Sequence, residues 1–495
     1  MVKRQKKHNR KSRNSKGFNK GRAGARKINA STGYETCTEQ LSPFGGLLAL
    51  IKFLDLVGFK EIFHSAYQAP LREPKLGHYE MMNGILMLLF IGFNRIWHFV
   101  YVRLDAMLCG FFRVTRLPAA STFWRYVDNL GINQGKSLLK VMAILRERVW
   151  QLCDIKLYRI RVNLDSTVET VYGNQQGARK GHNTKHRGKK GLRPVLGFIE
   201  ETREYLIGKL RKGSTVSGQE AAAVIMSIKE HLPGCVNQVL LRADGEFLSW
   251  ESVAAAIAAG FEFIIANKGC EPPFDSGRWY RPYKRQEVEF NSCTYQPIGW
   301  GRVCRFVAMR IPKEQERQPS KELVQCMLFE DDNYTYRIFC TSLLGKAHEN
   351  VAEYDKRADV ENLVGEAKRE GLEMIPTAKF KNNYAFFQIV MLAYNIWRYM
   401  KMIAHKSLSQ GQSAAERSGV LKGIVENTVR IARLKLLFIA AKVVKDGNVD
   451  KVKYSIHDAR TPAMLHVLKF LDKAREKSRI WRQGGICSQR FAVAS

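Results

Sequence analysis

The sequence predicts an α/β protein: a mixed sheet flanked by helices, interrupted by a β-rich insertion and preceded by an all-helical N-terminal domain. Three observations predict this class. Before about residue 150, apolar residues recur at three- and four-residue spacing, which is typical of helices. Beyond that point short apolar strands alternate with helices, as in a helix-covered sheet. Residues 270–344 then lose the helical period and become rich in strand and turn patterns.

The N-terminal part is expected to comprise two regions. Residues 1–33 form a basic, disordered arm that either contacts phosphates or only aids solubility. Residues 34–150 form a helical domain for DNA binding or dimerisation. Within it, 116–128 fits both a helix-turn-helix that reads DNA and ordinary helix packing, and both remain open. The expected helices are Gly46–Leu56, Tyr79–Tyr101 and Gly135–Val149.

The sheet domain is expected to occupy 151–269 and 345–440, with the insertion at 270–344 and a basic helical segment at 441–495. Its expected strands are Arg159–Asp165, Val195–Ile199, Glu204–Lys209, Gln238–Asp244 and Phe261–Ala266, and those of the insertion are Cys304–Met309, Leu323–Phe329 and Tyr334–Cys340. The expected helices are Glu220–His231, Trp250–Gly260, Tyr384–Ile403 and Thr461–Glu476.

The charge balance points to a nucleic-acid partner. The 495 residues hold 80 Lys and Arg against 46 Asp and Glu, a net charge of +34. Such an excess favours binding to nucleic acid or to an anionic membrane. No membrane span is expected, because the longest apolar run, Ile85–Phe93, is too short to cross a bilayer. The ten cysteines form no CxxC pair, which is typical of a reducing cytoplasm.

Two aspartates stand at the ends of apolar strands. Asp165 closes one strand and Asp244 closes another. Ligands of open α/β sheets gather at the carboxyl ends of the strands, so these two side chains are candidates for one site. A strand-end aspartate can also simply cap a turn, and neither residue is decisive alone.

A third acid lies on a helix with an unusual polar face. On a wheel of about 100° per residue, Tyr354, Arg357, Glu361 and Lys368 fall within about 60° of one another. The rival Glu366 lies about 140° from Glu361 on the same wheel and should face away. Two aspartates and a glutamate form a hard oxygen set that suits Mg²⁺ or Mn²⁺. Two such ions activate an attacking oxygen and stabilise a leaving one at phosphorus.

These residues resemble the signature of a known family, the DDE transposases of bacterial insertion sequences (group 1 transposase DDE domain). Tyr354, Arg357, Glu361 and Lys368 match its Tyr-x2-Arg-x3-Glu-x6-Lys pattern. Leu164-Asp-Ser-Thr and Ala243-Asp-Gly resemble the segments that carry its first two acids. The resemblance covers about residues 159–403.

The resemblance implies a ribonuclease H-like catalytic domain and cut-and-paste transposition in a bacterial, nucleoid-associated cytoplasmic setting. It implies two Mg²⁺ ions, with Mn²⁺ as a substitute, and double-stranded DNA as partner, both terminal inverted repeats and target. A homodimer is expected in the synaptic complex. By this resemblance the catalytic and metal-binding residues are Asp165, Asp244 and Glu361, and the residues at the DNA are Tyr354, Arg357 and Lys368.

A glycine-rich basic loop follows the first acid. Arg179, Lys180, Lys185 and Arg187 lie in it and are expected to contact the DNA backbone. The segment 208–215 approaches a phosphate-binding loop but lacks the lysine after its second glycine, so no nucleotide cofactor is expected. Two alternatives to a transposase remain: a non-enzymatic DNA-binding protein derived from one, and a structure-specific nuclease.

Overall fold

The computed structural model describes residues 28–181, 186–213, 215–282, 287–313, 333–409 and 423–483, without side chains at 408 and 477–483. The chain divides into two compact units, 1–39 and 40–495. Residues 28–39 contain neither helix nor strand. Most of the predicted basic arm, the predicted strand Leu323–Phe329 and the candidate Lys185 lie outside the described residues. The features below belong to the second unit.

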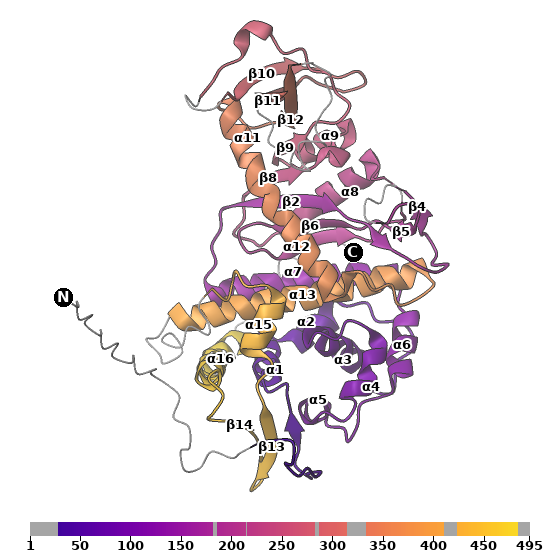
Figure 1. Cartoon of the computed structure of the whole chain (residues 1–495), viewed down its shortest axis with the longest axis vertical. Coiled ribbons are helices and arrows are strands. Elements are labelled where there is room, and N and C mark those ends of the chain that lie inside the picture. Colours follow the sequence, from indigo (N-terminus) through magenta and orange to yellow (C-terminus); the bar gives the residue numbers. More distant parts are fainter. Residues whose placement is uncertain are drawn as a thin grey trace, which may run out of the picture. The chain divides into compact units, whose positions relative to one another are not determined.

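Within the described residues, this unit contains an eight-stranded mixed sheet, which lies above α13 (Phe380–Ser409) in the view of Figure 1. Its strand order is β10-β11-β12-β9-β8-β2-β6-β7. The strands are β2 (Arg159–Ser166), β6 (Val195–Ile199), β7 (Tyr205–Lys209), β8 (Gln238–Ala243), β9 (Glu262–Ala266), β10 (Glu289–Tyr295), β11 (Cys304–Pro312) and β12 (Tyr334–Thr341). The mixed α/β class predicted from the sequence is therefore confirmed.

The strands β2, β6 and β7 form an antiparallel meander, and β8 and β9 then run parallel to β2. Parallel strands need crossover connections, and the helices α8 (Gly218–Ile228) and α9 (Trp250–Ala258) supply them. Ser217 and Glu220 form a capping box that fixes the start of α8. Every residue of β6 is buried, since helices and strands cover both faces of the sheet there.

The strands of the predicted insertion continue this same sheet. β12 pairs antiparallel with β9, which matches Phe339 with Ala266 and Thr341 with Ile264. β11 and β10 follow at the outer edge. An alternating apolar pattern predicts that strands form but not which edge they join, because pairing partners lie far away in sequence. The boundaries of the insertion stay a prediction, but its described strands are not a separate layer.

The N-terminal part of the second unit is helical. Its helices are α1 (Leu47–Leu56), α2 (Phe59–Ala66), α3 (His78–Phe90), α4 (Phe99–Val102), α5 (Ala106–Phe112), α6 (Ala120–Asp128) and α7 (Ile132–Cys153). The single helix predicted over Tyr79–Tyr101 is wrong, because α3 stops near Gly92. Gly92 has φ +97°, and the amide of Phe93 donates to the carbonyl of Leu88 (3.0 Å). This left-handed cap ends the helix.

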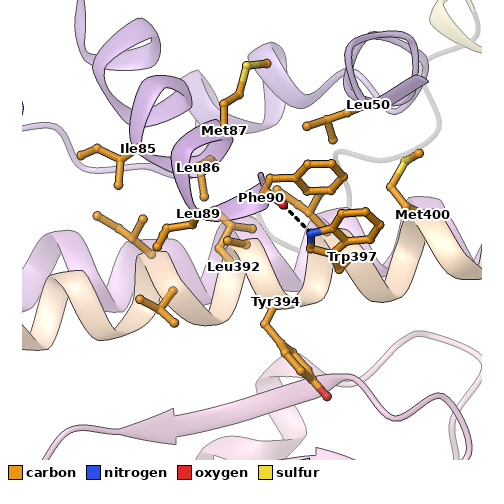
Figure 2. Packing of buried hydrophobic residues seen from close by; sticks show 14 of the residues in the cluster. Leu50, Ile85, Leu86, Met87, Leu89, Phe90, Leu392, Tyr394, Trp397 and Met400 are labelled. Carbon is orange, nitrogen blue, oxygen red and sulfur yellow. Dashed lines mark hydrogen bonds between the residues drawn. The ribbon is translucent and has the colours of Figure 1, made fainter. Parts of the chain in front are cut away.

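The long helix α13 (Phe380–Ser409) lies between these helices and the sheet (Figure 1). On one side the Trp397 indole stacks on Phe90 with ring centroids 4.0 Å apart and donates to the Phe90 carbonyl at 3.0 Å (Figure 2). On the other side the Tyr394 hydroxyl donates to the carbonyl of Arg203 (3.2 Å), and Gln388 donates to that of Gly208 on β7 (2.9 Å). α13 thus contacts both the N-terminal helices and the sheet, and it links these two parts of the core.

The segment carrying the predicted signature is not one straight helix. α11 (Ala347–Asp355) is followed by a 3-10 turn at Lys356–Ala358, and α12 (Asp359–Ala367) by a π-helical turn at Lys368–Leu372. Gly371 ends this turn with φ +121°. The wheel assumed one unbroken helix. The turn between α11 and α12 leaves Tyr354 on a different helix from Glu361.

The last part of the described chain adds a small sheet and two helices. β13 (Ala441–Asp446) and β14 (Val449–Tyr454) form a hairpin that pairs with β1 (Leu41–Ser42). They are accompanied by α15 (Val429–Leu436) and α16 (Thr461–Gln483). Among the described helices, none combines the length and the apolar character that crossing a bilayer requires.

Candidate active site

Two acids meet at the carboxyl ends of neighbouring parallel strands. β2 and β8 stay in register up to the pair Leu164 and Ala243, so the next residues, Asp165 and Asp244, lie side by side. Each carboxylate accepts a backbone hydrogen bond, Asp165 from the amide of Ser166 (2.9 Å) and Asp244 from the amide of residue 246 (3.1 Å). Both are partly buried. The two strand-end acids of the sequence prediction are therefore brought together.

The electrostatics of Asp165 indicate a crowded anionic site. Burial raises the pKa of Asp165 to about 7, Arg357 opposes this rise, and the charges of Asp244 and Glu361 add to it. Burial also raises the pKa of Asp244, again against the effect of Arg357. The carboxylates thus repel one another in a poorly solvated place. A bound cation would relieve this repulsion.

Arg357 is the cation at the centre of this group. It lies in the 3-10 turn between α11 and α12, and its side chain is 9% exposed. One guanidinium nitrogen donates to the Asp165 carboxylate at 3.3 Å and to the carbonyl of Leu164 at 3.1 Å. Arg357 therefore stabilises the charged form of Asp165. The sequence predicted that Arg357 lies at the DNA, but it did not predict this ion pair.

Glu361 lies on the outer side of α12. It is exposed, and its charge acts on Asp165. The rival Glu366 is buried on the opposite side, where its carboxylate pairs with Arg398 and accepts from the amide of Val429. The prediction that Glu366 faces away from the acid site is confirmed.

The other two signature residues hold parts of the fold together. Lys368 donates to the carbonyl of Val168 at 2.8 Å, and its ammonium lies 3.6 Å from a carboxylate oxygen of Glu169. The chain just after Asp165 is thereby attached to the π-helical turn that follows α12. Tyr354 is buried, with its ring 4.5 Å from that of Phe339 on β12. Its predicted contact with DNA stays a prediction, and its burial is explained by packing.

The basic loop forms a small antiparallel sheet beside the acids. β3 (Glu169–Thr170) and β4 (Arg179–Lys180) both pair with β5 (Lys190–Leu192). Arg179, Lys180 and Arg187 are exposed on this sheet and its connecting turn. Because β3 starts four residues after Asp165, this small sheet directly follows the first acid in the chain.

Two further acids, Glu169 and Glu246, follow the strand-end aspartates closely in sequence, and neither is an exposed surface charge. Glu169 is buried beside Lys368. The side chain of Glu246, 9% exposed, accepts from the hydroxyl of Ser166 (2.5 Å) and from Arg193 (2.8 Å). Their closeness in sequence to Asp165 and Asp244 was the available signal. It could not show that arginine and lysine partners from other segments would bury them.

Asp165, Asp244 and Glu361 offer the oxygen ligands that a hard divalent cation prefers, but the three side chains do not come together at one point. Among the residues that the structure describes, no three His, Cys, Asp or Glu side chains are arranged to hold a metal ion. Asp165 and Asp244 nonetheless supply adjacent carboxylates, and burial raises the pKa of both in spite of Arg357. These two residues fit a metal site. Glu361 would have to approach them to complete it.

A comparison with known protein families identifies the family of the chain. The family model for the transposase DDE domain, group 1, matches residues 29–476. The chain belongs to this family. The match extends from the helical N-terminal part through the sheet to α16, so the family assignment covers both the acids and the helices around them.

Other comparisons add little. No curated protein matches this chain. Among solved structures, the piggyBac transposase in a synaptic complex with hairpin DNA is similar at a TM-score of 0.39 and 10% identity, covering 90% of this chain and 84% of that one. A likeness at this level supports no conclusion about the present chain.

Proposed function

We propose that this family member is a DNA transposase that cuts and joins strands at the ends of a bacterial insertion sequence by a cut-and-paste route. The observation that carries the proposal is the meeting of Asp165 and Asp244 at adjacent strand ends, with Glu361 within electrostatic range and Arg357 between the acids and the core. This constellation suits phosphoryl transfer, in which charge develops on oxygens around phosphorus.

We propose a ribonuclease H-like arrangement for the catalytic core. It is supported by the order β7-β6-β2-β8-β9, in which a three-stranded antiparallel meander is followed by two strands parallel to the first. In this arrangement the first and second acids end the two central strands. The third is carried by a helix that arrives later in the chain.

The roles of the side chains follow from their places. Asp165, Asp244 and Glu361 would hold two Mg²⁺ ions, or Mn²⁺ in their place. When bound, such ions lower the pKa of an attacking water or hydroxyl and stabilise the leaving oxygen. Arg357 orients Asp165 through its hydrogen bond and lies near enough to share a backbone phosphate of the DNA. Tyr354 supports Arg357, whose guanidinium lies 5.9 Å from its ring centre.

The proposed partner is double-stranded DNA, both the terminal inverted repeats and the target. The exposed Arg179, Lys180 and Arg187 extend from the acid site and would follow the phosphate backbone. Lys185, between them in sequence, is proposed for the same role. The hydrogen bond from Lys368 to the Val168 carbonyl holds in place the start of the small sheet β3-β5-β4, called the basic ribbon below. We propose a homodimer in the synaptic complex and no nucleotide cofactor.

Mutation of the first acid tests the catalytic proposal. Asp165→Ala and Asp244→Ala should each abolish metal-dependent cleavage of DNA that carries the element's ends, while binding to that DNA persists. Glu262→Ala is a matched control, because Glu262 is an exposed carboxylate at the opposite end of a strand of the same sheet. Cleavage by Asp165→Ala at the wild-type rate, with binding unchanged, would show that the site is assigned wrongly.

A second assay separates the enzymatic alternatives. Pre-cut ends incubated with target DNA and Mg²⁺ should be joined to the target by a transposase, whereas a structure-specific nuclease would yield only cut products. Loss of joining after chelation, and its return with Mn²⁺, would support the metal dependence. Binding without any cleavage or joining would favour a non-enzymatic descendant.

A further inference from the structure

A cleft of about 450 Å³ lies away from the acids, between the helical part and the loop that follows the π-helical turn. Its lining includes Arg95 and Trp97 on a short 3-10 turn, Ser121 and Trp124 on α6, Met374 on the loop and Phe386 on α13. The size is that of a small-molecule site, and the lining is mostly apolar with a few polar groups. Neither the acids nor the basic ribbon belongs to it.

The aromatic walls of the cleft are unusually open to solvent. Trp97 is 51% exposed, Trp124 43%, and the neighbouring Tyr101 67%. The Trp124 indole donates to the carbonyl of Pro376 at 3.2 Å, which fixes this ring as one wall. Trp97 packs edge-on against Tyr101 with ring centroids 5.6 Å apart, so both rings keep a free area. Exposed apolar surface of this kind indicates a binding partner.

The charges around the cleft identify the class of partner. Within four residues of a lining residue lie the cations Arg95, Arg116, Arg125 and Lys379 and three acids, of which Asp128 pairs with Lys379 and Glu370 with Arg433, leaving Glu373 among the described residues. Two copies of this surface placed face to face would bring like charges together and repel. A polyanion is attracted instead. Aromatic rings beside cations are what single-stranded or unstacked nucleic acid binds, because each base offers a flat face to stack on.

We propose that this cleft binds one unpaired nucleobase of a DNA strand. The base stacks against Trp97 and Trp124, and Arg95 at the rim contacts the adjoining phosphate. The inference rests on the proposed function, because it takes DNA as the substrate. It deepens that function by giving the protein a preference for DNA in which a base is easily unstacked. The loop at the cleft directly follows the helix segment that carries Glu361 and Lys368.

The test compares two labelled duplexes of equal length and charge, one fully paired and one with a single T·T mismatch, by fluorescence anisotropy of the full chain without metal. Wild type should bind the mismatched duplex more tightly. Trp97→Ala should lose this preference, by about fivefold to a hundredfold. Trp97→Phe should keep most of it. Tyr158→Ala is the matched control, since Tyr158 is an aromatic residue of similar exposure, 62%, outside the cleft.

A second variant fills the cleft instead of removing a side chain from it, so that a folding defect of Trp97→Ala cannot explain the result. Ser121→Trp fills the cleft from an exposed position without removing a packed side chain, and it should abolish the preference as Trp97→Ala does. Thymidine monophosphate added alone should not quench tryptophan fluorescence at these concentrations. Quenching that Trp97→Ala removes would assign the cleft to a free nucleotide and overturn the strand assignment.

The remaining outcomes separate this inference from the proposed function. Equal binding of both duplexes by wild type overturns the cleft proposal but leaves DNA binding intact. No binding to either duplex overturns the proposed function itself. A change in sedimentation of Trp97→Ala without DNA, with the duplex preference unchanged, would identify the cleft as a contact between copies of the chain.

Discussion

Three glutamates on one short segment have entirely different surroundings. Glu361 is exposed on α12, and its charge acts on Asp165. Glu366 and Glu370 are buried on the other side, where they pair with Arg398 and Arg433. Residue type and local sequence are alike. What differs is the element opposite each side chain, and this decides whether a carboxylate is available for chemistry or only holds the fold together.

The buried pairs explain how the segment is held. Arg398 lies on α13 and Arg433 on α15, so each glutamate fastens the segment to a different helix. Glu370 lies four residues after Glu366, so the helical repeat places both on the same buried side. Such pairs add little net stability over apolar packing, but breaking one leaves an uncompensated charge inside. Among the described residues, the Glu361 side chain forms no comparable buried ion pair.

The largest effect should come from Glu361→Gln. Loss of a metal-binding carboxylate removes several kcal/mol of transition-state stabilisation, so DNA cleavage should fall on the order of a thousandfold or more. The free energy of unfolding should change by no more than about 0.5 kcal/mol, as for other exposed positions. Cleavage rates and urea unfolding of the same preparations measure both. A stability loss of several kcal/mol would remove the contrast with Glu366.

Glu366→Gln should show the opposite pattern. It leaves Arg398 charged and buried, which destabilises the fold by about 3–5 kcal/mol. The urea midpoint should drop, and cleavage by the fraction that remains folded should stay near wild type. Glu361→Gln in the same titration is the matched control. A normal urea midpoint together with lost cleavage would transfer the catalytic role to Glu366.

Glu246 lies between these extremes, since it is buried and paired but adjoins the acids. Glu246→Gln weakens its hydrogen bonds with Ser166 and Arg193, which position the chain beside Asp165 and Asp244. We expect cleavage to slow about 10–100-fold, as for other residues that orient metal ligands. Single-turnover kinetics should show a lower rate with unchanged DNA affinity. A fall in affinity alone would indicate a DNA contact instead.

The smallest effect within one pH unit concerns the buried side of the segment. Burial, and then the nearby Arg398, lower the pKa of Lys401 to about 7, although Glu366 opposes this. The unfolded state has the ordinary, higher pKa and binds more protons between about pH 7 and 10. The free energy of unfolding should therefore rise with pH in this window, by at most about 1.4 kcal/mol per pH unit from this group.

Lys401→Met tests that contribution. Subtracting the unfolding free energies of variant and wild type at each pH cancels the other titrating groups. The difference should favour the variant most near pH 7 and shrink as the pH rises toward 10. A difference independent of pH would show that Lys401 stays charged in the fold.

Much of the candidate site could be predicted because its signals are local. Strand periodicity placed Asp165 and Asp244 at strand ends, and the structure brings those ends together. The helical wheel separated Glu361 from Glu366, and their surroundings agree. A 3-10 turn interrupts the helix that the wheel assumed and leaves Tyr354 on α11, where its ring packs against Phe339 of β12 but still lies 5.9 Å from the Arg357 guanidinium.

Partners distant in sequence could not be predicted. The burial of Glu246 depends on Arg193, and that of Glu169 on Lys368. The cleft at Trp97 needs a loop near Met374 to complete it. No periodic pattern reports which segment will lie opposite a side chain, since a pattern gives only the direction of that side chain on its own element.

The sequence by itself determined the α/β class, the strand ends that carry two acids, the spacing of the signature and a net charge of +34, which favours a polyanionic partner. The tertiary structure alone decided that Arg357 pairs with an acid 192 positions away, that two of three neighbouring glutamates are buried, and that the described insertion strands extend the central sheet. The physical reason is that direction along a helix or strand is set locally, whereas burial and charge pairing are set by whatever packs against it.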